Sequence, residues 1–387
     1  MITLNTLQSK AVDMYLDWYY HPSTRKRPWF EISGAAGTGK TTVVNAITRE
    51  LGLTNEEVAF MAYVGKATLA LRKNGLPAKT IHSSIYDLKT TKKYDEFGNP
   101  YFIEDFFKKS HLPENIKQLV LDEGGMVGEK IGTDILSYGL PMVVLGDLNQ
   151  LPPVMASRMF LSNPDITLTE IMRQNKDSPI IYLSQLASHG CQIPYGSYGS
   201  DECLVIHKDE LEDEHLKESD IVICGTNRMR DIINRYIREK IQHIYSNRIT
   251  VGDKLVCRQN KWSINLNEDI ALVNGLIGYV EDVFMDAGQH DMLINFRPEF
   301  EDNDYFKKVP INHNYPFLPY EKRTKQNIRF LNGTAFEFGN AITCHLSQGS
   351  QYDTVLVYVE NSTNSLYFRQ WLYTAITRAV KKLILVI

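Results

Sequence analysis

The hydrophobic pattern of the chain alternates between short apolar runs and longer segments with helical spacing. In the first half, apolar runs at 29–33, 119–121 and 142–145 each lead into glycine or polar residues. Continuous apolar runs of this length between helices are typical of buried strands in a parallel sheet. The pattern therefore predicts an α/β unit in the first half, with polar side chains at the strand ends.

The second half repeats this alternation. Apolar runs at 220–225, 353–360 and 381–387 alternate with helical patterns at 226–241 and 366–376. They predict a second α/β unit.

Between the halves of this second unit the pattern changes to short strands separated by turns. Segments 251–260, 274–284 and 291–296 show no helix-length periodicity, and an Asn- and Pro-rich region runs to about Gly333. This pattern predicts a small inserted β-barrel. Its basic stretch, residues 320–330, has two interpretations: a surface that contacts phosphate groups, or a solvated polar loop.

Length and composition narrow the class of protein. A chain of 387 residues exceeds one ordinary core, and 43% hydrophobic with 23% charged residues indicates a globular protein of two domains. No apolar run is long enough to cross a bilayer, and the N-terminal sequence lacks the pattern of a signal peptide, so we expect a cytoplasmic protein without a membrane partner. A net charge of −4 argues against binding nucleic acid by overall charge, although it is compatible with a local basic groove.

The five cysteines are far apart and include no C-x-x-C pair, which argues against zinc and against a disulfide framework. We expect buried, reduced thiols. The residues concerned are Cys191, Cys203, Cys224, Cys257 and Cys344.

A glycine-rich loop joins the strand pattern at 29–33 to a helical pattern and matches G-x-x-x-x-G-K-[ST] in the context that this motif requires. Its backbone N–H groups can turn toward phosphate oxygens, Lys40 can neutralise the β and γ phosphates, and Thr41 can ligate Mg²⁺. A glycine-rich turn with a chance lysine is the competing interpretation, which the full match disfavours. The predicted nucleotide contacts here are Gly34, Ala35, Ala36, Gly37, Thr38, Gly39, Lys40, Thr41 and Thr42.

Acidic and polar residues follow the next two apolar runs. Asp122 and Glu123 come directly after 119–121; we expect Asp122 to hold Mg²⁺ through water and Glu123 to orient or deprotonate the attacking water. Taken alone, such a pair often caps a helix. The run at 142–145 leads into GDLNQLPPV, where Asp147 and Gln150 can sense a γ-phosphate. Since the carboxyl ends of parallel strands share one edge, these groups together predict a nucleoside triphosphatase.

In their order these motifs resemble the superfamily 1 helicases, specifically the RecD/Dda-type branch, many of whose members are phage or bacterial DNA helicases. The resemblance spans almost the whole chain, and GDLNQLPPV is its most specific signature after the glycine-rich loop. It implies an α/β fold of two RecA-like P-loop NTPase domains, with a β-hairpin called the pin inserted in the first and a small SH3-like β-barrel inserted in the second. The implied ranges are 1–85 and 114–176 for the first RecA-like domain, 86–113 for the pin, 177–255 and 336–387 for the second RecA-like domain, and 256–335 for the barrel.

Further motifs carry implied roles. Gln8 matches the N-terminal glutamine that reads adenine, and Arg173 in LTEIMRQ matches an arginine that reaches the nucleotide from the first domain. Gly349 belongs to a late motif that couples nucleotide to strand, and Arg378 in LYTAITRA matches the arginine finger. A guanidinium suits the charge that develops on a transferring phosphoryl group, and its supply from a second domain makes catalysis depend on domain closure. The predicted catalytic set is Lys40, Asp122, Glu123, Gln150, Arg173 and Arg378.

A translocating motor must also hold a strand through phosphate contacts. The resemblance implies that Lys66, Thr80 and His82 in the first domain and Thr343 and His345 in the second make them. For either histidine alone, a packing role with hydrogen bonds is the default interpretation.

Two segments depart from the branch. Gly124-Gly125 follows Asp122-Glu123 where the branch has Ala or Val and then Ser, and Tyr63-Val64 replaces Pro-Thr before Gly65. The loss of these hydroxyl groups affects the predicted coupling between ATP hydrolysis and strand movement more than it affects the predicted binding of ATP.

Residues 92–107, KKYDEFGNPYFIEDFF, lie where the branch inserts the pin. The turn at 97–100 would bring aromatic faces to the tip of a hairpin, where a ring can stack on the last base pair and split a duplex. An ordinary hairpin packed through Phe106 and Phe107 is the alternative. The expected strand-separating residues are Tyr94, Phe97, Tyr101 and Phe102.

The predicted function is an ATP- and Mg²⁺-dependent DNA helicase that moves on single-stranded DNA, with 5′ to 3′ polarity implied by the resemblance, and separates forked duplex DNA. The implied setting is DNA replication, repair and recombination by a monomer, in the host cytoplasm if phage-encoded, with single-strand-binding or replication proteins as partners. The residues leave two alternatives open: an RNA helicase, because phosphate contacts do not reveal the sugar, and a nucleic-acid-dependent ATPase switch without strand separation.

Overall fold

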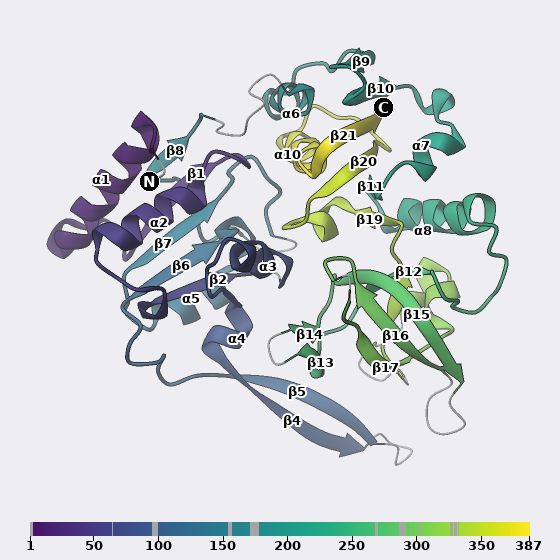
Figure 1. Ribbon diagram of the computed structural model, residues 1–387, viewed down its shortest axis with the longest axis horizontal. Coiled ribbons are helices and arrows are strands. Elements are labelled where there is room, and N and C mark those ends of the chain that lie inside the picture. The colour runs from purple at the N-terminus through teal and green to yellow at the C-terminus, as the bar shows by residue number, and fades with distance from the viewer. Residues whose placement is uncertain are drawn as a thin grey trace. The chain divides into compact units, whose positions relative to one another are not determined.

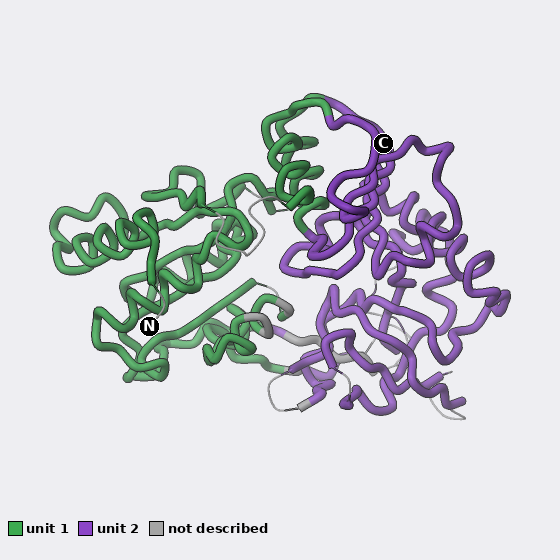
Figure 2. Tube along the Cα trace, turned by 45° about the horizontal axis from the view of Figure 1, so that its top comes forward, with its two compact units in different colours: residues 1–89, 106–192, 364–377 green, residues 90–105, 193–363, 378–387 purple. Residues whose placement is uncertain are grey.

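The computed structural model groups the chain into two compact units (Figure 2). Unit 1 comprises residues 1–89, 106–192 and 364–377, and unit 2 comprises 90–105, 193–363 and 378–387. The residues described are 3–63, 65–94, 100–153, 157–170, 178–267, 270–285, 292–301, 303–325, 328, 331 and 333–387, without the side chains of 66, 69, 70, 90, 94, 100–104 and 267.

Unit 1 is built on a six-stranded sheet in the order β3-β2-β6-β7-β1-β8, in which every strand pairs in parallel with its neighbours. The runs predicted at 29–33, 119–121 and 142–145 are strands of this sheet. Its strands are β1 (Trp29–Gly34), β2 (Val58–Ala62), β3 (Lys79–Thr80), β6 (Gln118–Asp122), β7 (Met142–Gly146) and β8 (Ile166–Leu168). Its helices are α1 (Thr6–Tyr20), α2 (Lys40–Glu50), α3 (Gly65–Lys73), α4 (Ile81–Ile85), α5 (Glu129–Leu136), α6 (Pro179–His189) and α10 (Leu366–Ile376).

Side chains that alternate along the strands feed two separate cores, one on each face of this sheet. Val120 and Val143 pack with residues of α1 and α2, as Figure 1 shows for the helices beside β1. Leu121 and Val144 point the other way and pack with residues of α4 and α5. Helices on both faces explain why these strands read as continuous apolar runs.

A two-stranded sheet, β4 (Tyr86–Tyr94) with β5 (Pro100–Lys108), occupies the position predicted for a hairpin. Phe97 and the side chains of Tyr94, Tyr101 and Phe102 lie outside the described residues. Phe106 packs its ring 5.2 Å from that of His82 and 5.9 Å from that of Tyr86. Phe107 is 53% exposed, so only one of the two phenylalanines expected to pack the hairpin is seen against a ring cluster.

Unit 2 contains a second six-stranded sheet in the order β19-β11-β20-β21-β10-β9, parallel except for the pair β9 and β10. The predicted runs at 220–225, 353–360 and 381–387 are three of its strands. They belong to the set β9 (Gly196–Tyr198), β10 (Cys203–Ile206), β11 (Ile221–Cys224), β19 (Ala341–Thr343), β20 (Tyr352–Tyr358) and β21 (Ala379–Val386). Two α-helices, α7 (Asp213–Lys217) and α8 (Asn227–Tyr236), belong to this part, and α8 continues into a π-helical turn, Ile237–Ile241.

The inserted segment of unit 2 is a five-stranded antiparallel sheet in the order β17-β16-β15-β12-β18, with a phenylalanine-rich core of its own. Its strands are β12 (Lys254–Cys257), β15 (Ile277–Met285), β16 (Met292–Pro298), β17 (Phe306–Ile311) and β18 (Phe336–Phe338), and a separate pair is β13 (Lys261–Asn267) with β14 (Ile270–Leu272). The sheet thus extends beyond the predicted 256–335 at both ends.

The basic stretch at 320–330 was predicted to be either a phosphate-contacting surface or a solvated loop, and one of its residues, Arg323, fits neither prediction. It begins with a four-residue helix, α9 (Tyr320–Arg323). Arg323 is 4% exposed and pairs with Asp231, so this side chain is neither a solvated loop residue nor a surface group. The charge pattern alone did not reveal a partner 92 residues away.

The compact units divide the chain at positions other than the predicted domain boundaries. Helix α10 and residues 178–192 belong to unit 1, while 90–105 of the hairpin belong to unit 2. The division into RecA-like domains therefore stays a prediction.

Four of the five cysteines are buried and free, as expected, and burial raises the pKa of the Cys203 thiol to about 12. Cys191 is exposed, so the expectation of a buried thiol is wrong there. It directly follows Gly190, the left-handed residue that ends α6. None of the helices in the described ranges combines the length and the apolar character that a membrane span needs.

Candidate nucleotide-binding site

The loop between β1 and α2 closes on itself around Lys40. Lys40 Nζ donates hydrogen bonds to Gly34 O at 2.6 Å and Ala35 O at 3.1 Å. Gly37 and Gly39 take φ values of 83° and 81°, which side chains other than glycine rarely adopt. Thr41 and Thr42 follow in the first turn of α2, whose N-terminus favours an anion. The loop thus turns at its glycines and holds Lys40 directed into it, and its role in binding phosphate stays a prediction.

Gln8 is attached to this loop. It is the third residue of α1, where a capping box with Asn5 uses its Oε1 as acceptor at 3.0 Å. Its Nε2 donates to Thr38 O at 3.0 Å, and a Cβ on Gly39 would lie only 2.3 Å from that nitrogen. The glutamine and the glycine therefore fit each other, and α1 is fixed to the phosphate loop through a side chain that is 2% exposed.

Asp122 is the last residue of β6, and its carboxylate faces the same edge. Burial raises the pKa of Asp122, while the nearby Lys40 ammonium and the N–H of Glu123, 2.9 Å from Oδ1, oppose that rise. Glu123 has a φ of 52°, a strained conformation for a non-glycine residue. Strain of this kind is concentrated at functional sites because the surrounding structure must hold it. The geometry therefore places the Asp122 carboxylate near the loop lysine, with Glu123 next to it in the chain.

The loop after β7 also meets this edge. Leu148 N donates to Ser33 Oγ at 3.2 Å, which joins the loop to the end of β1. Asp147 and Gln150, 5% and 7% exposed, are buried in it. Gln150 N donates to Asp147 O at 3.3 Å, so the loop is a compact turn.

Three residues outside the predicted site hold this loop. Tyr373 Oη donates to Asp147 Oδ2 at 2.6 Å, and Thr374 Oγ1 accepts from Leu151 N at 3.0 Å. Arg158 donates to Leu148 O at 3.2 Å and to Gln150 O at 2.7 Å. Tyr373 and Thr374 lie within the LYTAITRA motif and could have been noticed there. Arg158 had no signal in the sequence.

Of the two arginines predicted to contact the nucleotide, the structure describes only Arg378. Arg173 lies outside the described residues. Arg378 belongs to unit 2, is 3% exposed and donates to Ser350 O at 3.1 Å. Gly349, with a φ of 74°, precedes that serine. The structure thus brings Gln8, the phosphate loop, Asp122, Glu123 and the loop with Gln150 to one edge of unit 1, and Arg378 with Gly349 to one place in unit 2.

Two of the three predicted strand contacts of unit 1, Thr80 and His82, lie at the start of α4, and Lys66 lies in α3. Thr80 is the N-cap of α4 and accepts from Ser83 N at 3.2 Å. The His82 ring lies among aromatic rings, 6.5 Å from Tyr63 and 5.6 Å from Tyr86, and burial lowers its pKa. The side chain of Lys66 lies outside the described part.

The predicted strand contacts of unit 2 lie at the carboxyl end of β19 and just after it. Thr343 is the N-cap of a 3₁₀ turn, Cys344–Ser347, and His345 lies within that turn. Burial lowers the pKa of His345 as well. Both histidines therefore favour the neutral imidazole at neutral pH.

Two regions of the chain match known sequence families. Residues 19–197 match the AAA domain family, and residues 338–386 match the UvrD-like helicase C-terminal domain family. The first covers the phosphate loop, the two carboxylates and the loop after β7, and the second covers Arg378.

Curated relatives match most of this chain. An uncharacterised protein of Methanocaldococcus jannaschii is 25% identical over 92% of this chain and 36% of its own length. The ATP-dependent RecD2 DNA helicase of Deinococcus radiodurans is 26% identical over 90% of this chain and 45% of its own length. The chain therefore spans less than half the length of these relatives.

A solved structure extends the likeness to the whole fold. The Pif1 helicase from Bacteroides, in complex with ADP-AlF3 and single-stranded DNA, aligns with a TM-score of 0.54 at 16% identity, over 100% of this chain and 92% of that one. The protein thus shares the fold of this Pif1 helicase structure, and two of its segments match the AAA domain family and the UvrD-like helicase C-terminal domain family.

Proposed function

We propose that the protein is an ATP-dependent DNA helicase that moves along single-stranded DNA and separates duplex strands. The observation that carries this proposal is the edge of the unit 1 sheet, where Lys40 lies near Asp122 and the loop of Gln150 is bonded to the end of β1. The proposal is also supported by the sequence similarity to the RecD2 DNA helicase, which extends over 90% of this chain.

The residues of the phosphate loop fit ATP with Mg²⁺. Lys40 is already directed into the loop, and the Asp122 carboxylate near it is an oxygen ligand of the kind that Mg²⁺ prefers. When bound, the nucleotide would supply the phosphoryl group for hydrolysis, and Mg²⁺ would neutralise part of its charge. Thr41 and Asp122, the latter through water, would hold Mg²⁺, and Gln8 would contact the base from α1.

Glu123 is the residue we assign to the attacking water, which it would orient or deprotonate. Gln150 would sense the γ-phosphate from the loop after β7. Arg173 and Arg378 would stabilise the charge that develops in the transition state, with Arg378 as the finger. Gly349 would let the neighbouring backbone approach the nucleotide closely.

The finer assignment within the helicases is the RecD/Dda type, for which the RecD2 relative and the GDLNQLPPV sequence are the support. On this assignment the two six-stranded sheets are the cores of RecA-like domains, with the predicted boundaries. The five-stranded insertion would be the SH3-like barrel, and polarity would be 5′ to 3′.

Lys66, Thr80, His82, Thr343 and His345 would contact the strand backbone, and the β4–β5 hairpin would be the pin. Its aromatic tip, with Tyr94, Phe97, Tyr101 and Phe102, would stack on the last base pair of the duplex. Replacing Phe97 and Tyr101 together by alanine should spare strand-stimulated ATP hydrolysis and impair unwinding. Equal loss of both activities would assign these rings a structural role.

The experiment that tests the function is the unwinding of duplexes with a 5′ tail, a 3′ tail or both, made of DNA or RNA, in the presence of ATP. We expect unwinding of the 5′-tailed and forked DNA. Unwinding of the RNA duplexes alone would identify an RNA helicase. ATP hydrolysis stimulated by single strands without any strand separation would identify an ATPase switch.

A further inference from the structure

A groove of about 540 Å³ lies along one face of α8, with residues 316–321 of the insertion forming the opposite wall. Both walls belong to unit 2, and the groove contains none of the residues assigned to nucleotide or strand. Six of the side chains that α8 and its π-helical turn contribute are spaced at helical intervals: Arg228, Asp231, Ile232, Arg235, Tyr236 and Glu239. Asn234, Arg238 and Lys240 of the same elements line the groove as well.

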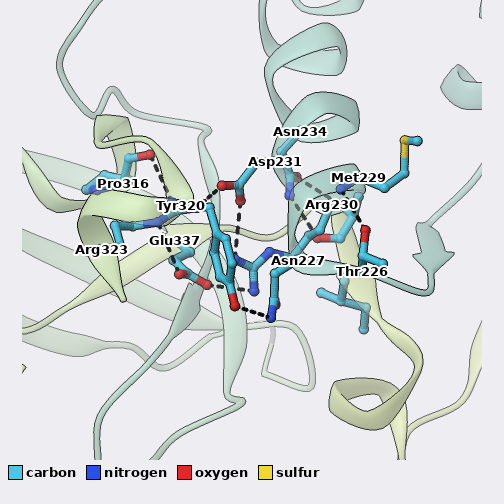
Figure 3. A network of polar contacts seen from close by, with 12 residues as sticks. Thr226, Asn227, Met229, Arg230, Asp231, Asn234, Pro316, Tyr320, Arg323 and Glu337 are labelled. Carbon is cyan, nitrogen blue, oxygen red and sulfur yellow. Dashed lines mark hydrogen bonds and ion pairs between the residues drawn. The ribbon is translucent and has the colours of Figure 1, made fainter. Parts of the chain in front are cut away.

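Buried ion pairs connect the two walls (Figure 3). Arg230 and Asp231 are on α8, whereas Arg323 and Glu337 belong to the insertion. Arg230 Nη1 lies 2.8 Å from Glu337 Oε2, and Arg323 pairs with Asp231. Arg230 and Arg323 are 1% and 4% exposed. Because each pair has one partner on each wall, the width of the groove is set before any ligand enters.

This network contains more guanidinium groups than carboxylates. Arg258 Nε also lies 3.0 Å from Glu337 Oε2, so Arg230, Arg258 and Arg323 share Glu337 and Asp231. Among the described residues, Arg323 Nε makes no hydrogen bond, although Glu337 Oε1 is 3.5 Å away. Arg323 itself lines the groove. The surplus positive charge favours an anionic ligand.

The rim carries both cations and exposed rings. Arg228, Arg235 and Lys240 are exposed lining residues, and the Tyr236 and Tyr245 rings are 43% and 69% exposed. Grooves that bind single-stranded nucleic acid combine cations along the backbone with rings on which bases stack. The acidic side chains of the rim are Glu239 and Glu321.

We propose that this groove binds a segment of single-stranded nucleic acid as a second site, separate from the predicted contacts at Thr343 and His345. The proposal rests on the proposed function for the identity of the strand. Cys224 at the end of β11 is level with Thr343, and α8 runs back from that edge, so the groove leads away from it. From Arg228 to Glu239 it extends about 16 Å at 1.5 Å per residue. That length holds about five nucleotides at ~3.4 Å each. The exposed rings favour bases over an acidic peptide as the occupant.

The test compares the full chain with a variant that carries Arg228→Ala, Arg235→Ala and Lys240→Ala. Binding of labelled oligothymidylates of about eight and about twenty nucleotides is followed by fluorescence anisotropy from about 50 to about 200 mM salt. For the long strand, we expect the slope of log affinity against log salt to fall by about two, because each of the three removed cations neutralises one phosphate and contributes ~0.7 to the slope. Affinity for the short strand, and its stimulation of ATP hydrolysis, should not change.

A matched variant, Lys10→Ala with Arg49→Ala and Lys73→Ala, removes three exposed cations from unit 1 and should keep the wild-type slope. A second groove variant, Tyr245→Ala, should weaken long-strand binding about fivefold without changing the slope, because stacking is uncharged.

An unchanged long-strand slope in the groove variant would overturn the proposal, as would an equal loss for the short strand. A labelled peptide of several glutamates and one phenylalanine tests the alternative occupant, an acidic protein segment. If it bound the wild type and lost that binding in the groove variant while DNA binding stayed intact, the occupant would be an acidic protein segment. Wild-type ATP hydrolysis that the short strand fails to stimulate would instead reject the proposed function.

Discussion

Tyr373 Oη donates a hydrogen bond to Asp147 Oδ2 at 2.6 Å and joins residues 226 positions apart in the chain. Asp147 begins the loop that follows β7, and Tyr373 is near the end of α10. Arg378 follows two residues after the last residue of α10. The loop that we assign to sensing the γ-phosphate is thus bonded to the helix that precedes the assigned arginine finger.

Replacing Tyr373 by phenylalanine should lower the free energy of unfolding by about 1.5–3 kcal/mol, because a buried carboxylate loses its hydroxyl donor. Urea denaturation measures this change. The matched control is Tyr20→Phe, a tyrosine that is 61% exposed, which should change stability by less than about 0.5 kcal/mol. Equal effects of the two substitutions would show that the bond to Asp147 does not stabilise the fold.

Lys40→Ala and Glu123→Gln should each reduce ATP turnover by about 10²-fold or more while leaving the fold intact, since one removes the phosphate cation and the other the carboxylate that handles water. Steady-state hydrolysis with purified variants measures this, and circular dichroism checks the fold. Lys10→Ala, an exposed lysine on α1, is the control. Unchanged hydrolysis by either site variant would reject the site assignment.

Arg378→Ala should retain nucleotide binding and lose about 10³-fold or more in hydrolysis, the range of arginine fingers. The residue is buried and donates to Ser350 O, so part of any loss could come from the fold. Arg378→Lys keeps the charge but not the planar fork, and should remain strongly impaired if the guanidinium acts on the phosphoryl group. Loss of nucleotide binding alone would contradict the finger role.

The two glycines that depart from the helicase pattern should respond differently to a side chain. A Cβ on Gly124 would lie 2.3 Å from Val144 Cγ1, whereas a Cβ on Gly125 would meet Leu161 Cδ1 at an ordinary 3.7 Å. Gly124→Ala should therefore cost about 1–3 kcal/mol through overpacking. Gly125→Ser, which introduces the hydroxyl that the resemblance to the RecD/Dda-type branch implies, should be nearly neutral in thermal denaturation. A larger loss for Gly125→Ser would mean that its backbone excludes a side chain.

His82 and His345 should both titrate below the ordinary pKa of 6.5 in the folded protein, because burial disfavours the imidazolium. The unfolded chain then takes up protons more readily, so stability should decrease as the pH falls below about 6.5. NMR titration of the ring protons measures the two values. Since His82 is neutral at pH 7, His82→Gln should weaken DNA binding without changing its salt dependence; a reduced salt slope would indicate a charged ring.

Much of the candidate site could be predicted from the sequence because its information is local. The phosphate loop needs glycines at fixed positions before Lys40, and the buried strands β6 and β7 read as apolar runs that end at Asp122 and Gly146. Parallel pairing then brings the strand ends to one edge. The insertion was also predictable as short strands, since its turns interrupt any helical period.

The tertiary structure alone decided which distant side chains meet. Arg323 belongs to a basic stretch predicted to lie at the surface, yet it is buried and paired with Asp231. Cys191 is exposed, although cysteine is usually a buried residue type. Tyr373 lies within a recognised motif, but its bond to Asp147 depends on how α10 packs in unit 1. Hydrophobic period and motif spacing reflect neighbours along the chain. Burial and pairing between remote residues follow from how whole elements pack, which no local pattern records.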